Sequence, residues 1–221
     1  MTLNVIRSQL YSLFAVLTCF PEEDIWSEVL PKGQITILKA LLEDLANEQI
    51  NAQDKGKNKE QSYGLVFFSP TLTLEQLNIE YTSLFDNTAK AVSLHGRSYL
   101  QNGDQKLFED LFRLYGHFGL QLNENKNDFW PDSLQMELEF MHYLTHLTTL
   151  NDHLGLNIYK AQRDFLNRQL LPLVKGISQA LKETNSEIYA PMLEVLHQFI
   201  VNEQAYLNEL IGDNINIQQV S

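Results

Sequence analysis

The sequence has little cysteine, a shortage of basic residues and no long apolar run, and each shortage excludes a class of protein. Its single cysteine, Cys19, has no partner for an internal disulfide and cannot supply a cysteine cluster for zinc or iron–sulfur ligation. A chain without disulfides fits a reducing compartment, so we expect a cytoplasmic protein. Because Leu17 and Phe20 lie beside Cys19, we interpret the thiol as a small core residue rather than a reactive group.

Basic residues are the second shortage. The chain has 16 Lys and Arg against 28 Asp and Glu, a formal net charge of −12, and no Lys or Arg follows Lys182. This balance argues against nucleic acid and anionic membranes as partners and favours basic ones. An acidic surface also promotes solubility, so charge alone does not choose a partner.

Apolar runs are the third shortage. Polar residues interrupt the apolar N-terminal stretch, residues 1–20, whose longest run extends only from Leu13 to Leu17. A membrane span needs about 18 apolar residues in succession. We therefore expect an amphipathic helix at the N-terminus rather than a signal peptide or a membrane span.

The motifs of common enzymes are also missing. The chain has no Gly-rich phosphate loop, no Gly-x-Ser-x-Gly elbow and no His-Glu-x-x-His zinc motif. We therefore predict that the protein is not an enzyme and carries no cofactor of its own. Aromatic residues, acids and a long central connection are present instead, and these are typical of a peptide-binding protein.

Helical periodicity runs along most of the chain, and sustained strand alternation is almost absent, so we predict an all-α protein. The 221 residues, 44% of them hydrophobic, are enough to bury a real core. We expect a compact fold of about eight to ten helices, as a single domain or two closely packed helical subdomains. The helices are expected at residues 3–20, from 22, 34–48, 74–85, 107–116, 131–150, 158–180 and 187–211.

The expected domain covers residues 1–212. It includes a flexible polar loop near 51–64 and a long connection near 86–103, and a frayed tail follows at 213–221. Pro172 should kink or split the helix in which it lies, and Gly212 should end the last helix.

A capping box starts the helix that carries the first candidate site residues. Thr73 is followed one turn later by Gln76, and an apolar stripe comes after them. The helix therefore carries Glu80 and Tyr81. Tyr81 and Phe85 both fall on its apolar stripe, so each is also a candidate core residue.

The most informative segment covers residues 128–141, because it starts a helix and places an acid among apolar residues. Proline is favoured at a first helical position, and an acid just after it complements the helix dipole. We therefore expect the helix to begin near Pro131 with Asp132 in its first turn. Helical geometry puts Glu137 on the apolar side and Glu139 on the polar side. A carboxylate at position 137 must be hydrogen-bonded, protonated or facing a groove, and a purely structural acid also fits.

Three blocks of the chain together resemble the TorD/DmsD/NarJ family of cytoplasmic chaperones for molybdenum-containing redox enzymes. The first block, Glu-Tyr-Thr-Ser-Leu-Phe at residues 80–85, is similar to the family's Glu-x-x-x-Phe-bearing helix. The second, residues 128–140, is similar to the family signature, Pro-Asp-His-Leu followed by Glu-Leu-Glu-Phe. The third, at residues 164–166 and 170–172, is similar to a later helix pair of the family.

Two positions depart from the family pattern. Ser133 stands where the signature has His, so any role of that imidazole is absent or altered in this chain. The family's Pro-x-x-Ser segment aligns with His-Gly-Arg-Ser at residues 95–98, which keeps Ser98 but lacks the proline.

The resemblance implies a non-enzymatic, all-helical chaperone of the cytoplasm. Its partners would be the apo catalytic subunit of a molybdopterin-containing oxidoreductase and the twin-arginine signal peptide of that subunit. The chaperone would assist cofactor insertion and proofreading before export or assembly. The resemblance allows both monomers and domain-swapped homodimers.

A twin-arginine peptide presents two guanidinium groups followed by an apolar run. Its receptor should therefore offer carboxylates beside an apolar groove, and the acids and apolar residues of the first two blocks can supply both. The predicted peptide-binding residues are Tyr81, Phe85, Ser98, Asp128, Trp130, Pro131, Asp132, Ser133, Leu134 and Glu137.

Two alternatives stay open. The pairs Glu139/His142 and Glu194/His197 lie on separate predicted helices and match half of a di-iron carboxylate bundle, which would make the protein a metal-binding helical bundle. Such a site needs both pairs to face the bundle axis, whereas the first pair falls on the polar face of its helix. The second alternative is a structural interaction domain that never meets a signal peptide.

Overall fold

The computed structural model of the protein describes residues 2–23, 38, 40–45, 73–86, 91–100, 103–120, 130–150 and 155–220, with side chains described as far as residue 212. Within these ranges the regular structure is helical, and a single isolated β-bridge takes the place of any strand. The prediction of an all-α protein is confirmed. No helix in these ranges is both long and apolar enough to cross a membrane.

Seven α-helices lie in the described part of the chain, slightly fewer than the eight to ten expected. They are α1 (Leu3–Leu17), α4 (Leu74–Tyr81), α5 (Asp104–His117), α6 (Leu134–Leu150), α7 (Gly155–Phe165), α8 (Leu171–Leu181) and α9 (Tyr189–Val220). A π-helical turn, Thr82–Asp86, extends α4, and a 3-10 turn, Gly96–Ser98, lies in the long connection. A second π-helical turn, Leu166–Leu170, joins α7 to α8.

The helix expected at 34–48 is described in part, and its residues 40–45 are helical. The helix expected from residue 22 lies almost wholly outside the described residues, and the loop expected near 51–64 lies wholly outside them.

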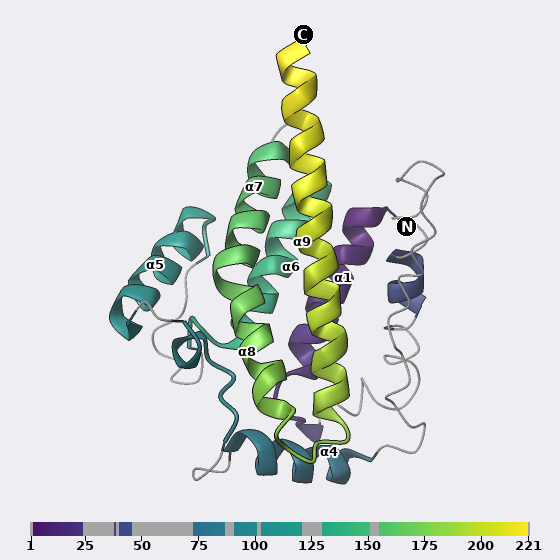
Figure 1. Ribbon diagram of the computed structural model, residues 1–221, viewed down its shortest axis with the longest axis vertical. Helices are drawn as coiled ribbons and strands as arrows, with labels where there is room; N and C mark the ends of the chain where they lie inside the picture. Colours follow the sequence, from purple (N-terminus) through teal and green to yellow (C-terminus); the bar gives the residue numbers. More distant parts are fainter. Residues whose placement is uncertain are drawn as a thin grey trace.

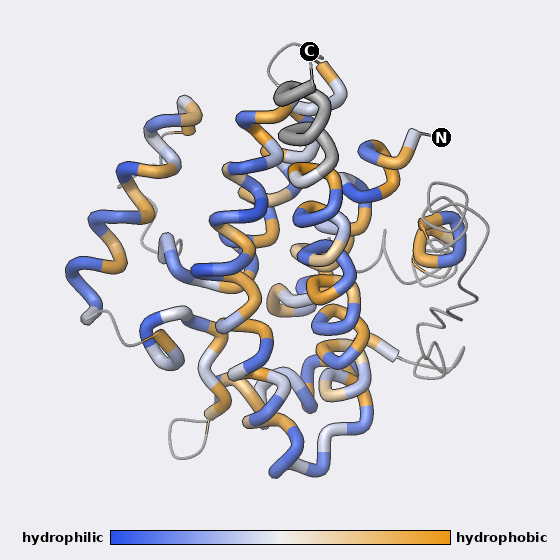
Figure 2. Tube along the Cα trace, turned by 45° about the horizontal axis from the view of Figure 1, so that its top comes forward, coloured by the Kyte–Doolittle hydropathy of each residue, from blue (hydrophilic) through white to orange (hydrophobic). Residues whose placement is uncertain are grey.

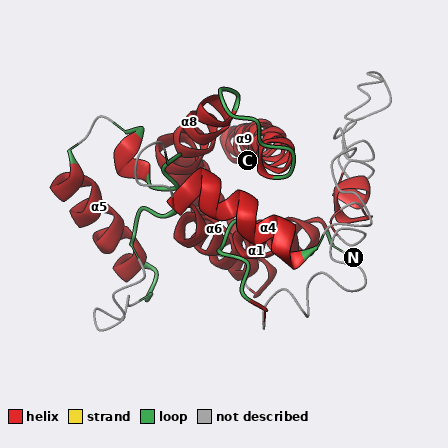
Figure 3. Ribbon diagram, turned by 90° about the horizontal axis from the view of Figure 1, so that it is seen from below, coloured by secondary structure: helices red, strands yellow, loops and turns green. Residues whose placement is uncertain are grey.

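The long helices form a bundle around one hydrophobic core. Figure 1 shows α7, α8 and α9 beside α6 and α1, with α4 lying across one end of the bundle and α5 standing to one side. Figure 3, seen from below, shows α4 crossing the ends of α1 and α6. In Figure 2 hydrophobic and hydrophilic residues alternate within the turns of the helices, as expected of amphipathic helices around a shared core.

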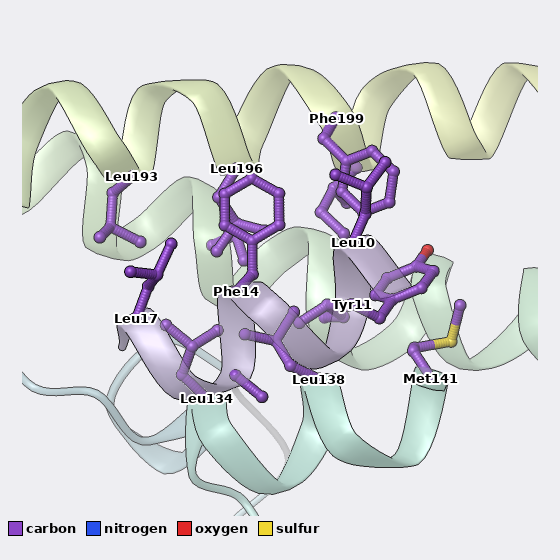
Figure 4. Close-up of a cluster of buried hydrophobic side chains, with 14 of the residues drawn as sticks. Leu10, Tyr11, Phe14, Leu17, Leu134, Leu138, Met141, Leu193, Leu196 and Phe199 are labelled. Carbon is purple, nitrogen blue, oxygen red and sulfur yellow. The ribbon is translucent and has the colours of Figure 1, made fainter. Parts of the chain in front are cut away.

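Helix α1 is the centre of the core, with α6 on one side and α9 on the other (Figure 4). The rings of Tyr11 and Phe14 pack against Phe199 of α9 at centroid distances of 4.9 Å and 5.6 Å. Leu138 and Met141 of α6 cover the opposite side of α1 and are fully buried. Burying an apolar side chain of this size contributes about 1.5–3 kcal/mol, so each of these residues adds substantially to the stability of the fold.

Helix α4 is fastened at both ends by hydrogen bonds. At its start, the capping box predicted from the sequence is confirmed, because Gln76 N–H donates to Thr73 Oγ1 and Thr73 N–H donates to Gln76 Oε1. Near its end, Glu80 Oε1 accepts hydrogen bonds from the backbone N–H groups of Ile188 and Tyr189 at 2.9 Å and 3.1 Å. Glu80 therefore caps the start of α9 and ties α4 to it.

Helix α6 begins at Leu134, so the predicted start near Pro131 is wrong by about one turn. Asp132 lies in the preceding turn and not in the first helical turn. The reason is that the backbone of this turn bonds across the chain: Gly96 N–H donates to Asp132 O at 2.7 Å, and Leu134 N–H donates to Leu94 O at 2.8 Å. Ser133 takes the capping role instead, because its Oγ accepts a hydrogen bond from Met136 N–H.

The last two helix predictions had different outcomes. Pro172 lies in the first turn of α8, directly after the π-helical turn Leu166–Leu170, which divides the expected 158–180 helix into α7 and α8 while the chain stays helical throughout. The predicted end of the last helix at Gly212 is wrong, since α9 continues to Val220. Gly212 lacks the positive φ of a C-cap glycine and lies inside the helix, at a cost of about 1 kcal/mol relative to alanine.

Candidate functional site

Two segments distant in sequence meet at the N-terminal end of α6. Residues 93–100 contain the 3-10 turn, and residues 130–133 form the turn before α6. An antiparallel bridge between His95 and Ser133 joins them. This juxtaposition surrounds Asp132, a predicted site residue, with groups from the long connection.

Asp132 is 0% exposed and is held by the 3-10 turn. Its Oδ2 accepts a hydrogen bond from Arg97 N–H at 2.9 Å and lies 3.2 Å from Arg97 Nε, while His95 Nδ1 lies 3.5 Å from Oδ1. Burial alone would raise the pKa of Asp132, but the nearby His95 ring, the hydrogen bond from the Arg97 backbone and the charge of Arg97 outweigh burial and lower the pKa. Asp132 is therefore a charged carboxylate that caps the 3-10 turn, rather than the capping acid of α6 that the sequence predicted.

The guanidinium group of Arg97 lies over two adjacent aromatic rings, whose centroids are 5.9 Å apart. Its Cζ atom is 4.2 Å from the ring centroid of Trp130 and 5.0 Å from that of Phe108. Together with the carboxylate of Asp132 these rings contact the cation, and we call Phe108, Trp130 and Asp132 the Arg97 cage. Trp130 is 46% exposed, so one wall of the Arg97 cage faces solvent.

Glu137 lies beneath this cluster, in the first turn of α6. It is 0% exposed, and neither carboxylate oxygen has a hydrogen-bond partner among the described residues. Burial, and secondarily the charge of Asp132, raises the pKa of Glu137 well above its usual range. Of the three states expected for this acid, the structure favours the protonated one, because full burial leaves no groove for it to face.

The 3-10 turn lies in van der Waals contact with both acids at position 96, where a Cβ atom would come nearest to Leu100 Cδ1, at 3.3 Å. A Cβ atom on Gly96 would lie 3.4 Å from Glu137 Oε1 and 3.5 Å from Asp132 Cβ. Ser98, the residue of this turn that the sequence singled out, is exposed, and its hydroxyl donates to Ser93 Oγ at 2.7 Å. The important contacts of the turn come instead from its neighbours His95, Gly96 and Arg97.

Other predicted residues of the 128–141 segment differ in how accessible they are. Pro131 is buried, and its carbonyl accepts a hydrogen bond from the Tyr115 hydroxyl at 2.7 Å. Leu134 is 1% exposed and belongs to the core shown in Figure 4. Trp130 is thus the accessible apolar residue of this segment in the described structure, and Asp128 lies outside the described residues.

Tyr81 and Phe85 form a second cluster, at the junction of α4 and α9. Their ring centroids lie 4.8 Å apart, and both rings contact Tyr189. Phe20, which is 42% exposed, covers Tyr81 at 5.4 Å. These contacts place Tyr81 and Phe85 in the packing between α4 and α9 and away from the Arg97 cage.

A groove of about 1090 Å³ runs between α5 and α7. Apolar side chains of both helices line it together with charged groups at its edges. The lining residues are Asp110, Leu111, Arg113, Leu114, His117, Phe118, Leu147, Asn157, Ile158, Ala161, Asp164, Phe165, Arg168 and Gln169. Phe108 of the Arg97 cage lies one turn before Leu111 on α5, so the cage and the groove share this helix.

The sequence indicated Trp130 and Asp132 of the Arg97 cage, but it did not reveal the groove, Phe108 or Arg97. The apolar stripes of α5 and α7 were visible as helical periodicity, but nothing local to either stripe indicates that a channel remains between them. The alignment of residues 95–98 with a family segment was the available signal for Arg97, and it directed attention to Ser98.

The two Glu-x-x-His pairs do not converge on a metal site. Glu139 is exposed and accepts a hydrogen bond from Gln135, while the ring of His142 contacts Ser8. Glu194 is also exposed. Across the described ranges no group of three or more His, Cys, Asp or Glu could hold a metal ion, so the geometry gives the metal-bundle alternative no support.

Cys19 is not an activated nucleophile. Its thiol donates to Ala15 O at 3.0 Å, and burial, with smaller effects from Glu139 and Glu22, raises its pKa to about 12. The thiolate that nucleophilic chemistry requires is therefore disfavoured at neutral pH.

Comparison with known proteins finds a family model, a relative of known role and a similar solved structure. Residues 51–178 match the family model of the nitrate reductase delta subunit. A perchlorate reductase assembly chaperone protein from Dechloromonas aromatica (strain RCB) is 28% identical over 222 aligned positions, which cover 94% of this chain and 91% of that protein. A crystal structure of a proposed redox enzyme maturation protein from Archaeoglobus fulgidus aligns over 88% of this chain and 93% of its own, with 22% identity and a TM-score of 0.48.

Proposed function

The chain belongs to the nitrate reductase delta subunit family, and on that premise we propose that it is an assembly chaperone for a molybdopterin-containing oxidoreductase, and not itself a catalyst. Family membership agrees with the resemblance found in the three sequence blocks. The assembly role of the perchlorate reductase chaperone, which aligns with nearly the whole chain, supports the proposal. A reductase is accordingly the class of client that we expect.

We further propose that the chaperone acts in the cytoplasm on the apo catalytic subunit and its twin-arginine signal peptide, through cofactor insertion and proofreading. The observation that carries this proposal is the shared position of the Arg97 cage and the groove along α5. A signal peptide of this kind places arginines just before an apolar segment. The Arg97 cage suits the arginines, and the groove suits the apolar segment.

The surface beside the cage and the charge of the chain support a basic partner. The net charge of −12 attracts a cationic segment at long range. Specific binding then needs apolar contact, and Leu114, Phe118 and Ala161 of the groove provide a surface for it. A peptide bound there would remain accessible to the client's catalytic subunit on the solvent side.

The proposal is tested by titrating the protein with a twin-arginine signal peptide and with the same peptide carrying two lysines. We expect the lysine peptide to bind at least about tenfold more weakly, because lysine lacks the planar fork that stacks on rings and pairs with carboxylate. Equal binding of the two peptides would contradict arginine recognition.

A groove variant tests the apolar half of the site. Ala161→Trp should fill the groove and weaken binding of the twin-arginine peptide by about tenfold or more, because the apolar segment loses its surface. Gln179→Trp adds the same bulk at an exposed position of α8 outside the groove and serves as the control. Co-purification of the full chain with a reductase precursor tests the chaperone role itself, and failure to recover any such precursor would favour a structural interaction domain.

A further inference from the structure

The guanidinium group of Arg97 occupies a site with the parts of an arginine receptor. The rings of Trp130 and Phe108 stand 4.2 Å and 5.0 Å from its Cζ atom, and Asp132 Oδ2 lies 3.2 Å from Nε. Proteins recognise guanidinium groups through this combination of aromatic faces and a carboxylate. Phe108 belongs to α5, whereas Trp130 and Asp132 belong to the turn before α6. The receptor groups therefore come from segments other than the one that carries Arg97.

Arg97 fills this receptor incompletely. Its backbone N–H and its Nε both contact Oδ2 of Asp132, and within the described structure the buried Oδ1 has no hydrogen-bond partner. His95 Nδ1 approaches Oδ1 only to 3.5 Å. The strongest arginine–carboxylate pairs are bidentate, with one N–H group on each oxygen. An arginine that enters from another direction can use the oxygen that Arg97 leaves unpaired.

The Arg97 side chain can leave without disrupting the turn that carries it. The side chain of Arg97 is 23% exposed, and the neighbouring Trp130 opens the cage to solvent. The 3-10 turn is held by backbone bonds, from Arg97 N–H to Asp132 Oδ2 and from Gly96 N–H to Asp132 O. These bonds do not involve the guanidinium group, so they stay intact on exchange. Exchange breaks only the contacts of the guanidinium group itself, with Asp132 Oδ2, with the two rings and with His95 Nδ1, which lies 3.2 Å from Nη2.

We propose that the Arg97 cage is an arginine-binding site, that Arg97 is its internal and exchangeable occupant, and that an arginine of the client's signal peptide displaces it. The identity of the incoming arginine rests on the proposed function, whereas the cage and its occupant are properties of this chain. Only molecules in which Arg97 has left the cage can bind the peptide arginine. The apparent Kd is therefore the intrinsic Kd divided by the fraction of such molecules. Arg97 thus selects for peptides whose arginine makes the better, bidentate contact.

Replacing Arg97 tests the exchange directly. Arg97→Ala removes the internal competitor and keeps the backbone bond to Asp132, so this variant should bind the twin-arginine peptide at least about tenfold more tightly than the native chain. Its affinity for the twin-lysine peptide should change little. Equal or weaker binding of the arginine peptide by a folded Arg97→Ala protein would overturn the proposal. If Arg97→Ala does not fold, Arg97→Gln provides the same comparison with a neutral polar side chain.

The gain in affinity should depend on the cage. Adding Phe108→Ala to Arg97→Ala removes one ring and should abolish the gain, whereas adding Phe112→Ala, at an exposed position on the same helix, should leave it intact. A gain that survives the loss of Phe108 would mean that Arg97 acts through some other contact, and it would overturn the proposal.

A small-molecule probe tests binding to the Arg97 cage separately from recognition of the signal peptide. Methylguanidinium chloride should change the fluorescence of Trp130 in Arg97→Ala but not in the chain with Arg97, both carrying Trp26→Phe so that a single tryptophan reports. If methylguanidinium enters the empty cage but no variant binds the twin-arginine peptide, signal-peptide recognition fails while the cage stands. If the native chain binds the peptide but methylguanidinium leaves Arg97→Ala unchanged, the cage proposal fails while the proposed function stands.

Discussion

Asp132 and Glu137 are buried acids of the same cluster, and their surroundings move their pKa values in opposite directions. Asp132 has the charge of Arg97 and a backbone N–H group beside it, so its pKa is lowered. Glu137 has neither, and burial with the nearby charge of Asp132 raises its pKa. One acid is therefore held charged and the other protonated, which leaves a single negative charge to be balanced by Arg97.

Glu137 should make the stability of the protein depend on pH. Above its ordinary pKa of 4.5 the unfolded chain releases this proton and the folded chain keeps it, so the free energy of unfolding falls as pH rises. The slope reaches at most about 1.4 kcal/mol per pH unit and persists until pH reaches the raised pKa. Glu137→Gln cannot ionise, and we expect urea unfolding between about pH 5 and 7 to show a flatter slope for this variant.

The matched control is Glu139→Gln, on the exposed face of the same helix, which should keep the native slope. Asp132 does not obscure the comparison, because the stability contributed by a lowered pKa is lost only as pH falls below the ordinary aspartate value of 3.8. Native-like slopes for both variants would mean that Glu137 is ionised in the folded protein.

The connections between helices depend on a few capping and close-packing contacts. Glu80 of α4 accepts three hydrogen bonds at the start of α9, from the Ser186 hydroxyl and from the backbone of Ile188 and Tyr189. The long connection is fastened to α8 in a different way, by the ring of Tyr99 lying against Gly176. Each contact holds one element in position relative to another, and each can be removed separately.

Glu80→Ala should destabilise the protein by about 1–3 kcal/mol, because two backbone N–H groups and a hydroxyl lose their acceptor. Glu80→Gln keeps an acceptor oxygen but loses the charge that complements the helix dipole, so its cost should be smaller. Urea unfolding measures both values. Glu183→Ala, at an exposed position after α8, is the control and should have little effect. An equal loss in the free energy of unfolding for Glu80→Ala and Glu183→Ala would contradict the capping role of Glu80.

Gly176→Ala should displace the long connection. A methyl group at position 176 would overlap Cδ1 of the Tyr99 ring and lie 2.6 Å from its Cγ, so either the ring moves or the helix strains, at a cost of about 1–3 kcal/mol. Thermal unfolding measures the loss. Gly116→Ala on α5 has no atom within 4 Å of the new methyl and should instead stabilise by about 1 kcal/mol. An unchanged thermal stability of Gly176→Ala would show that the contact with Tyr99 is not close in solution.

The two ends of the chain meet in a buried ion pair. Arg7 of α1 and Glu203 of α9 approach to 2.7 Å, and both side chains are fully buried. Tyr11 donates its hydroxyl to Glu203, and Gln162 of α7 accepts a hydrogen bond from Arg7. Burial opposes the charge on Arg7, but Glu203 outweighs burial and raises the arginine pKa. The network specifies how α1, α7 and α9 pack against one another.

Breaking this pair from one side should be the most damaging of the changes considered. Arg7→Met leaves a buried carboxylate without its cation and should lower the free energy of unfolding by about 3–5 kcal/mol. Adding Glu203→Leu and Tyr11→Phe removes the orphaned carboxylate and the hydroxyl bonded to it and should recover at least half of that loss, because apolar residues of similar size can replace a buried ion pair. Denaturant unfolding of the single and triple variants checks the recovery. A triple variant no more stable than Arg7→Met would contradict it.

Much of the fold could be predicted from local sequence because its causes are local. The Thr73–Gln76 capping box, the apolar stripe of α1 and the place of Pro172 depend on residues a few positions apart, and hydrogen bonds or sterics act directly between them. The start of α6 could not be predicted in this way. Asp132 follows a proline as a helix-starting acid does. However, its side chain and its backbone carbonyl both accept hydrogen bonds from the 3-10 turn, about 35 residues earlier in the chain.

The chain alone determined that the protein is all-helical, that it has an acidic surface and that Glu137 lies on an apolar face, since composition and helical period decide these. Tertiary packing decided which groups surround Glu137 and which residues form the candidate site. Arg97, Phe108 and Asp132 come together only because the long connection meets the turn before α6 and α5 stands to one side of the bundle (Figure 1). The groove arises in the same way, from two amphipathic helices that do not close completely on each other. Contacts between distant segments depend on the sum of many packing energies, and no short pattern of residues encodes that sum.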